Sequence, residues 1–268
     1  MKLLFSESKS DYGHYLYPYV IWAVPEPGER PGQFFARGFM PGTPDFERYY
    51  LCRHLRVDLR KFEPSSENRR ILRKCAGVTG HLVSRAQFEY TSAHRQAWRA
   101  YADERWGKGV MSEQRLDGLF VGRVVSHVIV FHDAAGAEVG AVVLYLEEPE
   151  MAFYYYGFYD LAWLKRSLGM FMMTWTMDFF TQAGLRYLYL GTCYSERALY
   201  KTQFEGLEFF NGFRWSTDLD ELKHLLHREQ HAAHTHLLAT PEFRDAFYAG
   251  DLHRIAALSP FHLPLPPG

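Results

Sequence analysis

Residues 160–171, DLAWLKRSLGMF, combine features that predict an anion-binding turn. Arg166 supplies positive charge, and Gly169 follows three residues later at the start of an apolar run of helical length. The first backbone N–H groups of a helix lack partners within the helix, and the helix dipole adds positive potential there. We therefore expect Arg166, Ser167 and Gly169 to bind a substrate anion, unless Gly169 only lets the helix pack closely against the preceding strand.

This Arg-x-x-Gly turn is similar to the one with which GNAT-type acyltransferases bind the pyrophosphate of coenzyme A. In those enzymes a second small residue follows the glycine, whereas this chain has Phe171. We expect the ring of Phe171 to crowd the backbone that a pyrophosphate must approach. The turn therefore favours a ligand other than coenzyme A.

The segments around this turn predict an α/β fold with a mixed sheet. Alternating or continuous apolar residues indicate strands, and apolar residues at helical spacing indicate helices. The expected strands are 123–132, 137–148, 151–160, 186–194 and 207–215, and the expected helices are 86–105, 166–183 and 195–204. The strand at 151–160 is apolar on both faces, so we expect it in the middle of the sheet. The helix at 166–183 then crosses over to the next strand.

Three regions are expected along the chain: an N-terminal lobe, a central α/β domain and a helical C-terminal appendix with a frayed tail. Their bounds are 1–80, 85–217 and 218–268. The lobe is expected to contain strands at 12–24 and 48–59. It also contains a helix at 64–75, for which Ser65 or Ser66 is the expected N-cap.

Charge and cysteine content exclude several classes of protein. The formal net charge is −1, so no global positive field indicates a nucleic-acid partner, and a local patch would have to bind one. The three cysteines, Cys52, Cys75 and Cys193, are far apart, so we expect neither a disulfide framework nor a four-cysteine zinc site. No stretch reaches the roughly 20 apolar residues of a membrane span, and no signal peptide is evident. These features predict a cytoplasmic protein without a membrane partner.

Three blocks of the sequence resemble the arginyl- and leucyl-tRNA–protein transferases, the aminoacyltransferases of the N-end rule. Residues 51–74 carry a Cys, Leu-Arg-Val, a Phe and a Ser-rich stretch before Arg-Arg. Residues 153–171 carry an aromatic strand that ends in Tyr-Asp, followed by Ser-Leu-Gly. Residues 187–210 carry Tyr-Leu-Gly, then Tyr-Lys and a following Phe. The blocks keep the order of the family and lie within roughly residues 35–215.

The resemblance implies a GNAT-like acyltransferase fold that works without coenzyme A or another cofactor. An aminoacyl-tRNA would be the donor, with arginine as the favoured amino acid, and the N-terminus of a protein or peptide would be the acceptor. Members of the family usually carry a cysteine cluster ahead of the Leu-Arg-Val segment, and only Cys52 remains here. An iron–sulfur or other metal centre is therefore not expected.

The implied reaction is the attack of a neutral N-terminal amine on the ester carbon of an aminoacyl-tRNA, with stabilisation of an oxyanion. Asp160, at the end of the central strand, is the candidate for holding or deprotonating the amine; its alternative role is to cap the next helix. Tyr200 is expected to donate to the oxyanion or to relay a proton, unless it packs in the core. Glu196 is a weaker acid–base candidate.

Basic and aromatic residues are the candidate contacts to tRNA. Lys201 suits the phosphate of the terminal adenosine, and the aromatic residues of 154–159, with Tyr156 and Tyr159 among them, could stack on its base. Further contacts to the acceptor stem are expected from one segment, namely from Arg56, Ser66, Asn68, Arg69, Arg70 and Lys74. Each group has an ordinary alternative: a solvated face for the basic residues and core packing for the tyrosines.

Two other functions stay open from the sequence. One is an acyl-coenzyme A-dependent GNAT N-acetyltransferase, and the other is a non-catalytic relative that binds tRNA or protein. His224, His227, His231 and His234 share one face of an expected helix. They could bind a metal, but a solvated face is the simpler interpretation.

Overall fold

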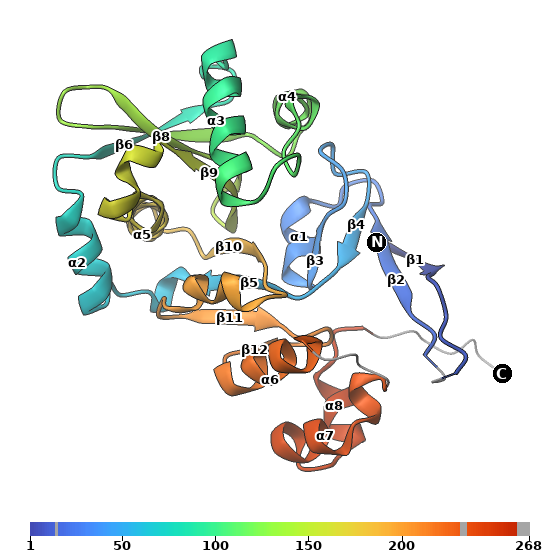
Figure 1. The fold of residues 1–268 in the computed structure, drawn as a ribbon. Coiled ribbons are helices and arrows are strands. Elements are labelled where there is room, and N and C mark those ends of the chain that lie inside the picture. Colours follow the sequence, from blue (N-terminus) through green and yellow to red (C-terminus); the bar gives the residue numbers. More distant parts are fainter. Residues whose placement is uncertain (14–15, 231–234, 262–268) are drawn as a thin grey trace.

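A computed structural model covers residues 1–268, and it describes residues 1–13, 16–230 and 235–261. The centre of the fold is a mixed eight-stranded sheet in the order β12-β11-β5-β10-β9-β8-β7-β6 (Figure 1). Its strands are β5 (His54–Asp58), β6 (Thr79–Ser84), β7 (His127–His132), β8 (Glu138–Glu147), β9 (Met151–Tyr159), β10 (Tyr187–Thr192), β11 (Leu207–Phe210) and β12 (Trp215–Ser216). The predicted α/β class with a mixed sheet is confirmed.

The long crossover helix is also confirmed. β9 and β10 are parallel neighbours, and the chain between them forms the 3-10 helix η2 (Leu161–Arg166) and then α5 (Leu168–Gln182). Gly184, at a φ of +77°, follows α5 in the left-handed conformation with which glycine ends many helices. β9 lies between β8 and β10, as expected of a strand that is apolar on both faces.

Helices cover both faces of the sheet (Figure 1). They are α1 (Pro31–Ala36), α2 (Ser66–Lys74), α3 (Ser92–Arg105), α4 (Glu113–Val121), α6 (Leu219–Gln230), α7 (Pro241–Tyr248) and α8 (Leu252–Leu258), with the short 3-10 helices η1 (Leu59–Lys61), η3 (Glu196–Thr202) and η4 (Leu237–Ala239). One apolar layer joins the sheet to α5, α2, α6 and α7, and the other joins it to α1, α3 and α4. Side chains alternate between these layers, with Phe131 of β7 in the first and Val130 in the second.

The sheet draws strands from both sides of the boundary expected near residue 80. The predicted strand at 48–59 forms two strands, β4 (Tyr49–Leu51) and β5. β5 is inserted between β10 and β11 of the large sheet. The segment that was assigned to the N-terminal lobe therefore supplies an inner strand of the central domain.

A second, four-stranded sheet forms the N-terminal part, in the order β1-β2-β4-β3. Its remaining strands are β1 (Lys2–Glu7), β2 (Tyr19–Val24) and β3 (Phe39–Pro41). The strand expected at 12–24 is therefore shorter than predicted, and residues 14–15 lie outside the described part of the chain.

The C-terminal appendix is helical as predicted. Of the four histidines expected on one helical face, His224 and His227 lie on α6, whereas His231 and His234 are outside the described residues. In the described part of the chain, no three His, Cys, Asp or Glu side chains are grouped so as to bind a metal ion. The helices described here are also too short or too polar to cross a bilayer.

His54 is buried without charge in the second apolar layer, which predicts acid lability. Its Nδ1 donates to the carbonyl oxygen of Cys52 at 3.0 Å, and its Nε2 has no partner. Burial lowers the pKa of His54 from 6.5 to about 4, so between these values the unfolded chain binds a proton that the folded chain does not. Stability therefore falls as the pH drops through this window, by about 3 kcal/mol in total.

Chemical unfolding between pH 4 and pH 8 measures this effect. His54→Phe is expected to flatten the dependence of the unfolding free energy on pH in the window from about 4 to 6.5. His253→Gln, at an exposed position on α8, is the control and should leave the slope unchanged. An unaltered slope in His54→Phe would assign the acid lability to another group.

Candidate functional site

The two parallel strands are paired only over their first halves. The last residues in register are Phe153 of β9 and Tyr189 of β10. Beyond this point β9 continues along β8, while β10 continues along β5. The strands therefore separate into a wedge that opens in the direction of their C-terminal ends.

A β-bulge in β9 directs tyrosines to both sides of this wedge. Leu144 of β8 pairs with Tyr154, but the preceding Val143 pairs with Tyr156, so Tyr155 has no partner in register. Such a bulge changes the face toward which the following side chains point. Tyr154 packs in the layer of α5, whereas Tyr156 packs in the layer of α3.

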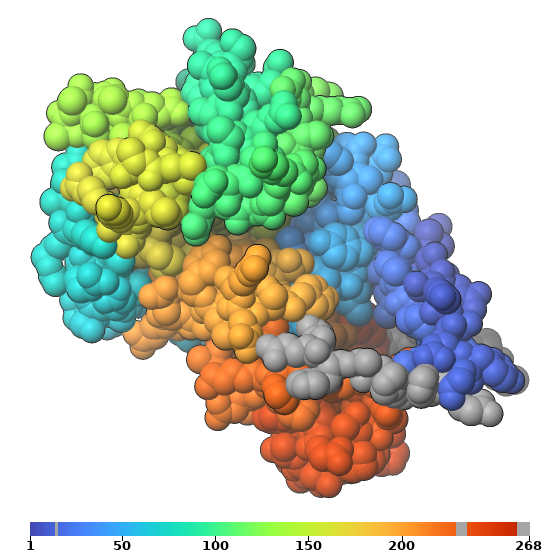
Figure 2. Space-filling model, viewed as in Figure 1, coloured from blue at the N-terminus to red at the C-terminus, as the bar shows by residue number. Residues whose placement is uncertain are grey.

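A pocket of about 960 Å³ occupies the wedge. Its walls come from the end of α3, the second half of β9, the first turns of α5, the end of β10 and η3. In Figure 2 these segments meet on one face of the molecule, with α3 in green, α5 in yellow and η3 in orange. The pocket therefore lies beside the junction between β9 and α5, with Tyr159 and Gly169 in its wall.

Cations line this pocket, and no carboxylate of the described residues does. The cations are Arg105 at the end of α3 and Arg197 and Lys201 on η3. The Nζ of Lys201 donates to the carbonyl oxygen of Thr192 at 3.3 Å, and burial lowers the pKa of this lysine. A partly desolvated positive charge interacts more strongly with an anion than one in bulk water. The pocket is therefore suited to a substrate with negative groups.

Tyrosine hydroxyls are the other polar groups of the pocket. Burial raises the pKa values of Tyr101, Tyr154 and Tyr200, and the nearby charge of Arg105 opposes the shift at Tyr101 and Tyr200. The phenols therefore stay protonated at neutral pH and can act as hydrogen-bond donors.

Five predicted site residues line this pocket: Tyr156, Tyr159, Gly169, Tyr200 and Lys201. Tyr200 is 49% exposed, so it is not a core residue. The Tyr156 hydroxyl and the Nη2 atom of Arg115 are 3.0 Å apart, with the guanidinium as donor. The structure brings these residues together, and their individual roles remain predictions.

The two carboxylates predicted for acid–base work lie outside the pocket wall. Asp160 is exposed, and its Oδ1 accepts from the backbone N–H of Ala162 at 2.9 Å. It therefore holds the capping role that was its alternative. Glu196 is exposed on η3, next to the lining residues Ser195 and Arg197.

In the predicted anion-binding turn, the charged side chain of Arg166 contacts other groups of the protein. Arg166 donates through Nη2 to the carbonyl oxygen of Lys74 at 3.1 Å, and its guanidinium lies 4.3 Å from the ring centre of Trp163. Lys74 in turn donates to Oγ of Ser167 at 3.2 Å. A Cβ on Gly169 would lie 2.8 Å from the ring of Tyr159, so the glycine allows close packing of α5 on β9.

Phe171 does not obstruct this turn, which corrects the expectation from the sequence. The side chain is 3% exposed and packs in the core, 6.1 Å from the ring centre of Phe131. Two residues of an α-helix turn the side chain by roughly 200°, so Phe171 points away from the face that Gly169 presents to the pocket. The argument that this ring blocks a pyrophosphate is therefore wrong.

The predicted residues of the basic segment lie away from the pocket wall. The N-cap of α2 is Ser65, whose Oγ accepts from the N–H of buried Asn68 at 3.1 Å, and Ser66 is the first residue of the helix. Arg70 pairs with Glu67 at 2.6 Å, and Arg69 donates to the carbonyl of Pro64.

Arg56 of β5 belongs to another pocket, of about 450 Å³. Its Nη2 lies 2.6 Å from Glu208, and its guanidinium stacks between the rings of Tyr187 and Trp215. Arg56 is therefore engaged with neighbouring side chains.

Sequence reasoning missed Tyr101, Arg105 and Arg197, all of which line the main pocket. Two signals were available. Tyr101 and Arg105 are four residues apart on the helix predicted at 86–105, and Arg197 and Lys201 are four residues apart on the helix predicted at 195–204, so each pair shares a face. The helix ends were not assigned to the site because nothing in the spacing shows which face of α3 meets β9.

Comparison with known proteins places the pocket inside a recognised domain. Residues 79–211 match the family model described as "Arginine-tRNA-protein transferase, C terminus". This range extends from β6 to β11 and contains every residue of the pocket wall.

Curated relatives extend the similarity over more of the chain. The chain is 29% identical to the aspartate/glutamate leucyltransferase of Thiobacillus denitrificans over 185 residues, which cover 67% of this chain and 72% of the relative. It is 26% identical to the aspartate/glutamate leucyltransferase of Chromobacterium violaceum over 190 residues, with coverage of 69% and 76%. Among solved structures it is similar to a tandem GNAT protein from the clavulanic acid biosynthesis pathway, at a TM-score of 0.38 and 14% identity, over 70% of this chain and 59% of that one.

Proposed function

Because residues 79–211 belong to the C-terminal domain of the arginyl/leucyl-tRNA–protein transferase family, we propose that this chain is an aminoacyl-tRNA–protein transferase whose active site is the pocket between β9 and β10. The observation that carries the proposal is that every residue of the pocket wall lies in the matched range. The pocket provides cations that can bind a negatively charged aminoacyl-tRNA and hydrogen-bond donors that can stabilise an oxyanion.

The pocket wall supports an apolar aminoacyl group. Arginine, the amino acid favoured by the sequence resemblance, is not confirmed, since the relatives are named leucyltransferases. An arginyl side chain in this pocket would face Arg105, Arg197 and Lys201 without a carboxylate partner among the described lining residues. The methionines Met170 and Met173 of α5 instead offer an apolar surface. Leucine is therefore the proposed donor amino acid.

The same charges support an acceptor with an acidic first residue. Arg105 and Arg197 line the pocket from opposite walls, α3 and η3. None of the ion pairs among the described residues involves either of them. A guanidinium binds a carboxylate with two parallel hydrogen bonds. The acceptor would be a protein or peptide with N-terminal Asp or Glu.

The other pocket residues suit the 3′ end of the donor. Lys201 would bind a phosphate, and the rings of Tyr156 and Tyr159 would stack on the terminal adenine. Tyr200, half exposed at the pocket, would donate to the donor's carbonyl or ribose oxygens. The reaction needs no cofactor, because the ester of the donor is already activated.

Incubation with charged tRNA and peptides tests the function. The protein is mixed with tRNA pools that carry radiolabelled leucine, arginine or other amino acids and with peptides that differ in their first residue. We expect transfer of leucine to peptides that begin with Asp or Glu. Because Phe171 is buried and leaves the turn open, the assay must also include acetyl-coenzyme A as an alternative donor. Acetylation, without transfer from any tRNA, would contradict the proposal.

A further inference from the structure

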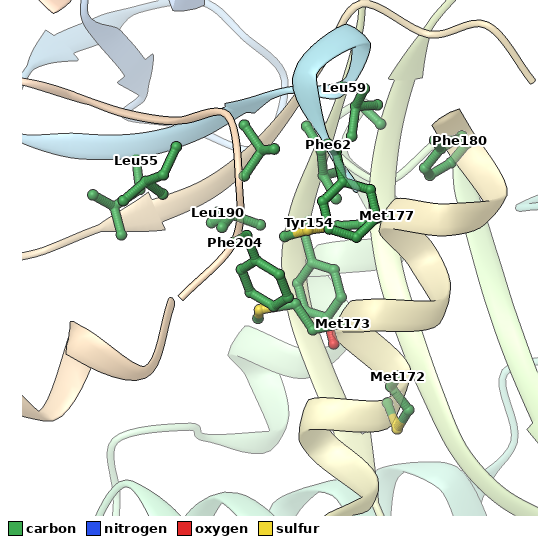
Figure 3. Packing of buried hydrophobic residues seen from close by; sticks show 14 of the residues in the cluster. Leu55, Leu59, Phe62, Tyr154, Met172, Met173, Met177, Phe180, Leu190 and Phe204 are labelled. Atoms are coloured by element: carbon green, nitrogen blue, oxygen red, sulfur yellow. The ribbon is translucent and has the colours of Figure 1, made fainter. Parts of the chain in front are cut away.

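Tyr154 occupies the vertex of the wedge between β9 and β10. It is the first residue of β9 after Phe153, where the pairing with β10 ends. Its side chain is 7% exposed and packs among residues such as Met173 and Leu190. Figure 3 shows the hydroxyl directed away from Met177, toward the N-terminal half of α5. That half of α5 forms part of the pocket wall, so the ring lies in the core and its hydroxyl points toward the pocket.

The side chain of Tyr154 is more than nine-tenths buried, and its hydroxyl forms no hydrogen bond with the described residues. The phenol oxygen is not one of the fully buried polar atoms that lack a partner, so it reaches the accessible space of the pocket. The hydroxyl can find a partner in the pocket, whose wall includes Tyr154.

Gly157 leaves room for this hydroxyl. A Cβ at position 157 would lie 2.5 Å from the phenol oxygen of Tyr154, closer than any real contact. The backbone of Gly157 is not in the left-handed region, so its conformation does not require glycine. The absence of a side chain at this position therefore serves the placement of the Tyr154 hydroxyl.

We propose that Tyr154 is a catalytic residue, whose hydroxyl donates a hydrogen bond to the donor's carbonyl oxygen as that oxygen becomes an oxyanion. The inference rests on the proposed function. In this arrangement the aminoacyl ester is the part of the substrate that reaches deepest into the pocket. Its carbonyl group therefore meets the hydrogen-bond donor that is fixed at the closed end. Such a preorganised donor interacts more strongly with the oxyanion than with the neutral carbonyl.

The proposed step balances without a further reactant. The acceptor's neutral amine nitrogen forms a bond to the ester carbon, and the π electrons of the carbonyl move to the oxygen that Tyr154 contacts. When the intermediate collapses, the carbonyl forms again and the bond from carbon to the ribose oxygen breaks. One amine proton is lost and one proton is gained by the ribose oxygen, so an amide and a free ribose hydroxyl result. Tyr154 keeps its own proton throughout.

Tyr154→Phe tests the role because it removes only the oxygen. We expect kcat to fall about 100-fold. KM for aminoacyl-tRNA should stay within about threefold, since the ground-state carbonyl gains little from the bond. The midpoint of thermal unfolding should be unchanged, because the ring still fills the core. An unchanged kcat would overturn the proposal. So would a fall in kcat that is matched by weaker binding of aminoacyl-tRNA and by a lower midpoint of thermal unfolding.

Gly157→Ala provides an independent perturbation. The added methyl group displaces the hydroxyl, so kcat should fall by a similar factor. In the Tyr154→Phe background the same change should have little further effect, because the oxygen that it meets is gone. Gly118→Ala, on α4 with no atom within 4 Å of the new Cβ, is the matched control and should be silent. Additive losses from Tyr154→Phe and Gly157→Ala would contradict a shared mechanism.

The wild-type assay separates this inference from the proposed function. If the wild type transfers an amino acid from tRNA and Tyr154→Phe does so equally well, the role of Tyr154 is wrong and the function stands. If the wild type transfers nothing from any charged tRNA, both proposals are overturned.

Discussion

Charge reversal at Arg105 and Arg197 together is expected to lower kcat/KM for peptides with N-terminal Asp by about 1000-fold. Each guanidinium–carboxylate hydrogen bond contributes about 1.5–3 kcal/mol, and the variant replaces two such bonds with repulsion. Both arginines line the pocket, and no described carboxylate pairs with either of them. The double variant Arg105→Glu/Arg197→Glu should also gain activity toward peptides that begin with Lys or Arg. Transfer of radiolabelled leucine to a series of peptides measures both effects.

Two comparisons make this result specific. The double variant Lys9→Glu/Lys108→Glu changes the net charge by the same amount at exposed residues outside the pocket wall, and it should keep the preference for Asp. A peptide that begins with Asn has nearly the shape of the Asp peptide without its charge. If the arginine variant loses the Asp and Asn peptides to the same extent, Arg105 and Arg197 contact the donor tRNA rather than the acceptor.

Much of the central sheet could be predicted from local pattern, because each strand has its own apolar signal. β7, β8, β9 and α5 lie within one to four residues of their predicted bounds. β6 was missed because its sequence, TGHLVS, has a glycine and little apolar alternation. α4 was missed since its sequence, EQRLDGLFV, is short and contains a glycine.

Long-range pairing could not be predicted. β5 pairs with β10 and β11, which follow it by more than 120 residues, and nothing local to β5 identifies these partners. For the same reason, the wedge between β9 and β10 could not be predicted from the sequence. The split between β9 and β10 depends on which strand each one follows beyond Phe153 and Tyr189.

The site shows the same division between local and tertiary information. Gly169, Tyr200 and Lys201 were predicted from local sequence motifs, and they do line the pocket. Arg166 was predicted from the Arg-x-x-Gly turn and its charge, but its guanidinium donates to the carbonyl oxygen of Lys74 at the end of α2. A basic residue near the start of one helix can bind the last carbonyl groups of another helix, and the sequence does not show that the second helix lies nearby. Tyr154 was grouped with the other aromatics because only the bulge distinguishes it.

Glu221→Ala is expected to be the most destabilising single change in the C-terminal appendix. The carboxylate is fully buried, and it accepts from Asn211, Tyr248 and Ser216 at 2.6–2.7 Å and from Arg214 at 3.2 Å. Removal of the acceptor leaves these donors unsatisfied, which should cost about 3–5 kcal/mol of the free energy of unfolding. Denaturant unfolding of the full chain measures the loss.

Glu221→Gln and Asp220→Ala divide this effect into its causes. Glutamine keeps one acceptor oxygen but turns an amide N–H₂ toward donors, so about 2 kcal/mol should be lost. Asp220, the adjacent residue, is 83% exposed and pairs with Lys223 at 2.9 Å, so its removal should cost less than about 1 kcal/mol. The network joins α6 and α7 to the turn after β11, and β11 is paired with β5 at the centre of the sheet. If Glu221→Ala unfolds at the same denaturant concentration as Asp220→Ala, this network does not hold the appendix on the sheet, and the apolar contacts of Leu222 and Leu226 must do so instead.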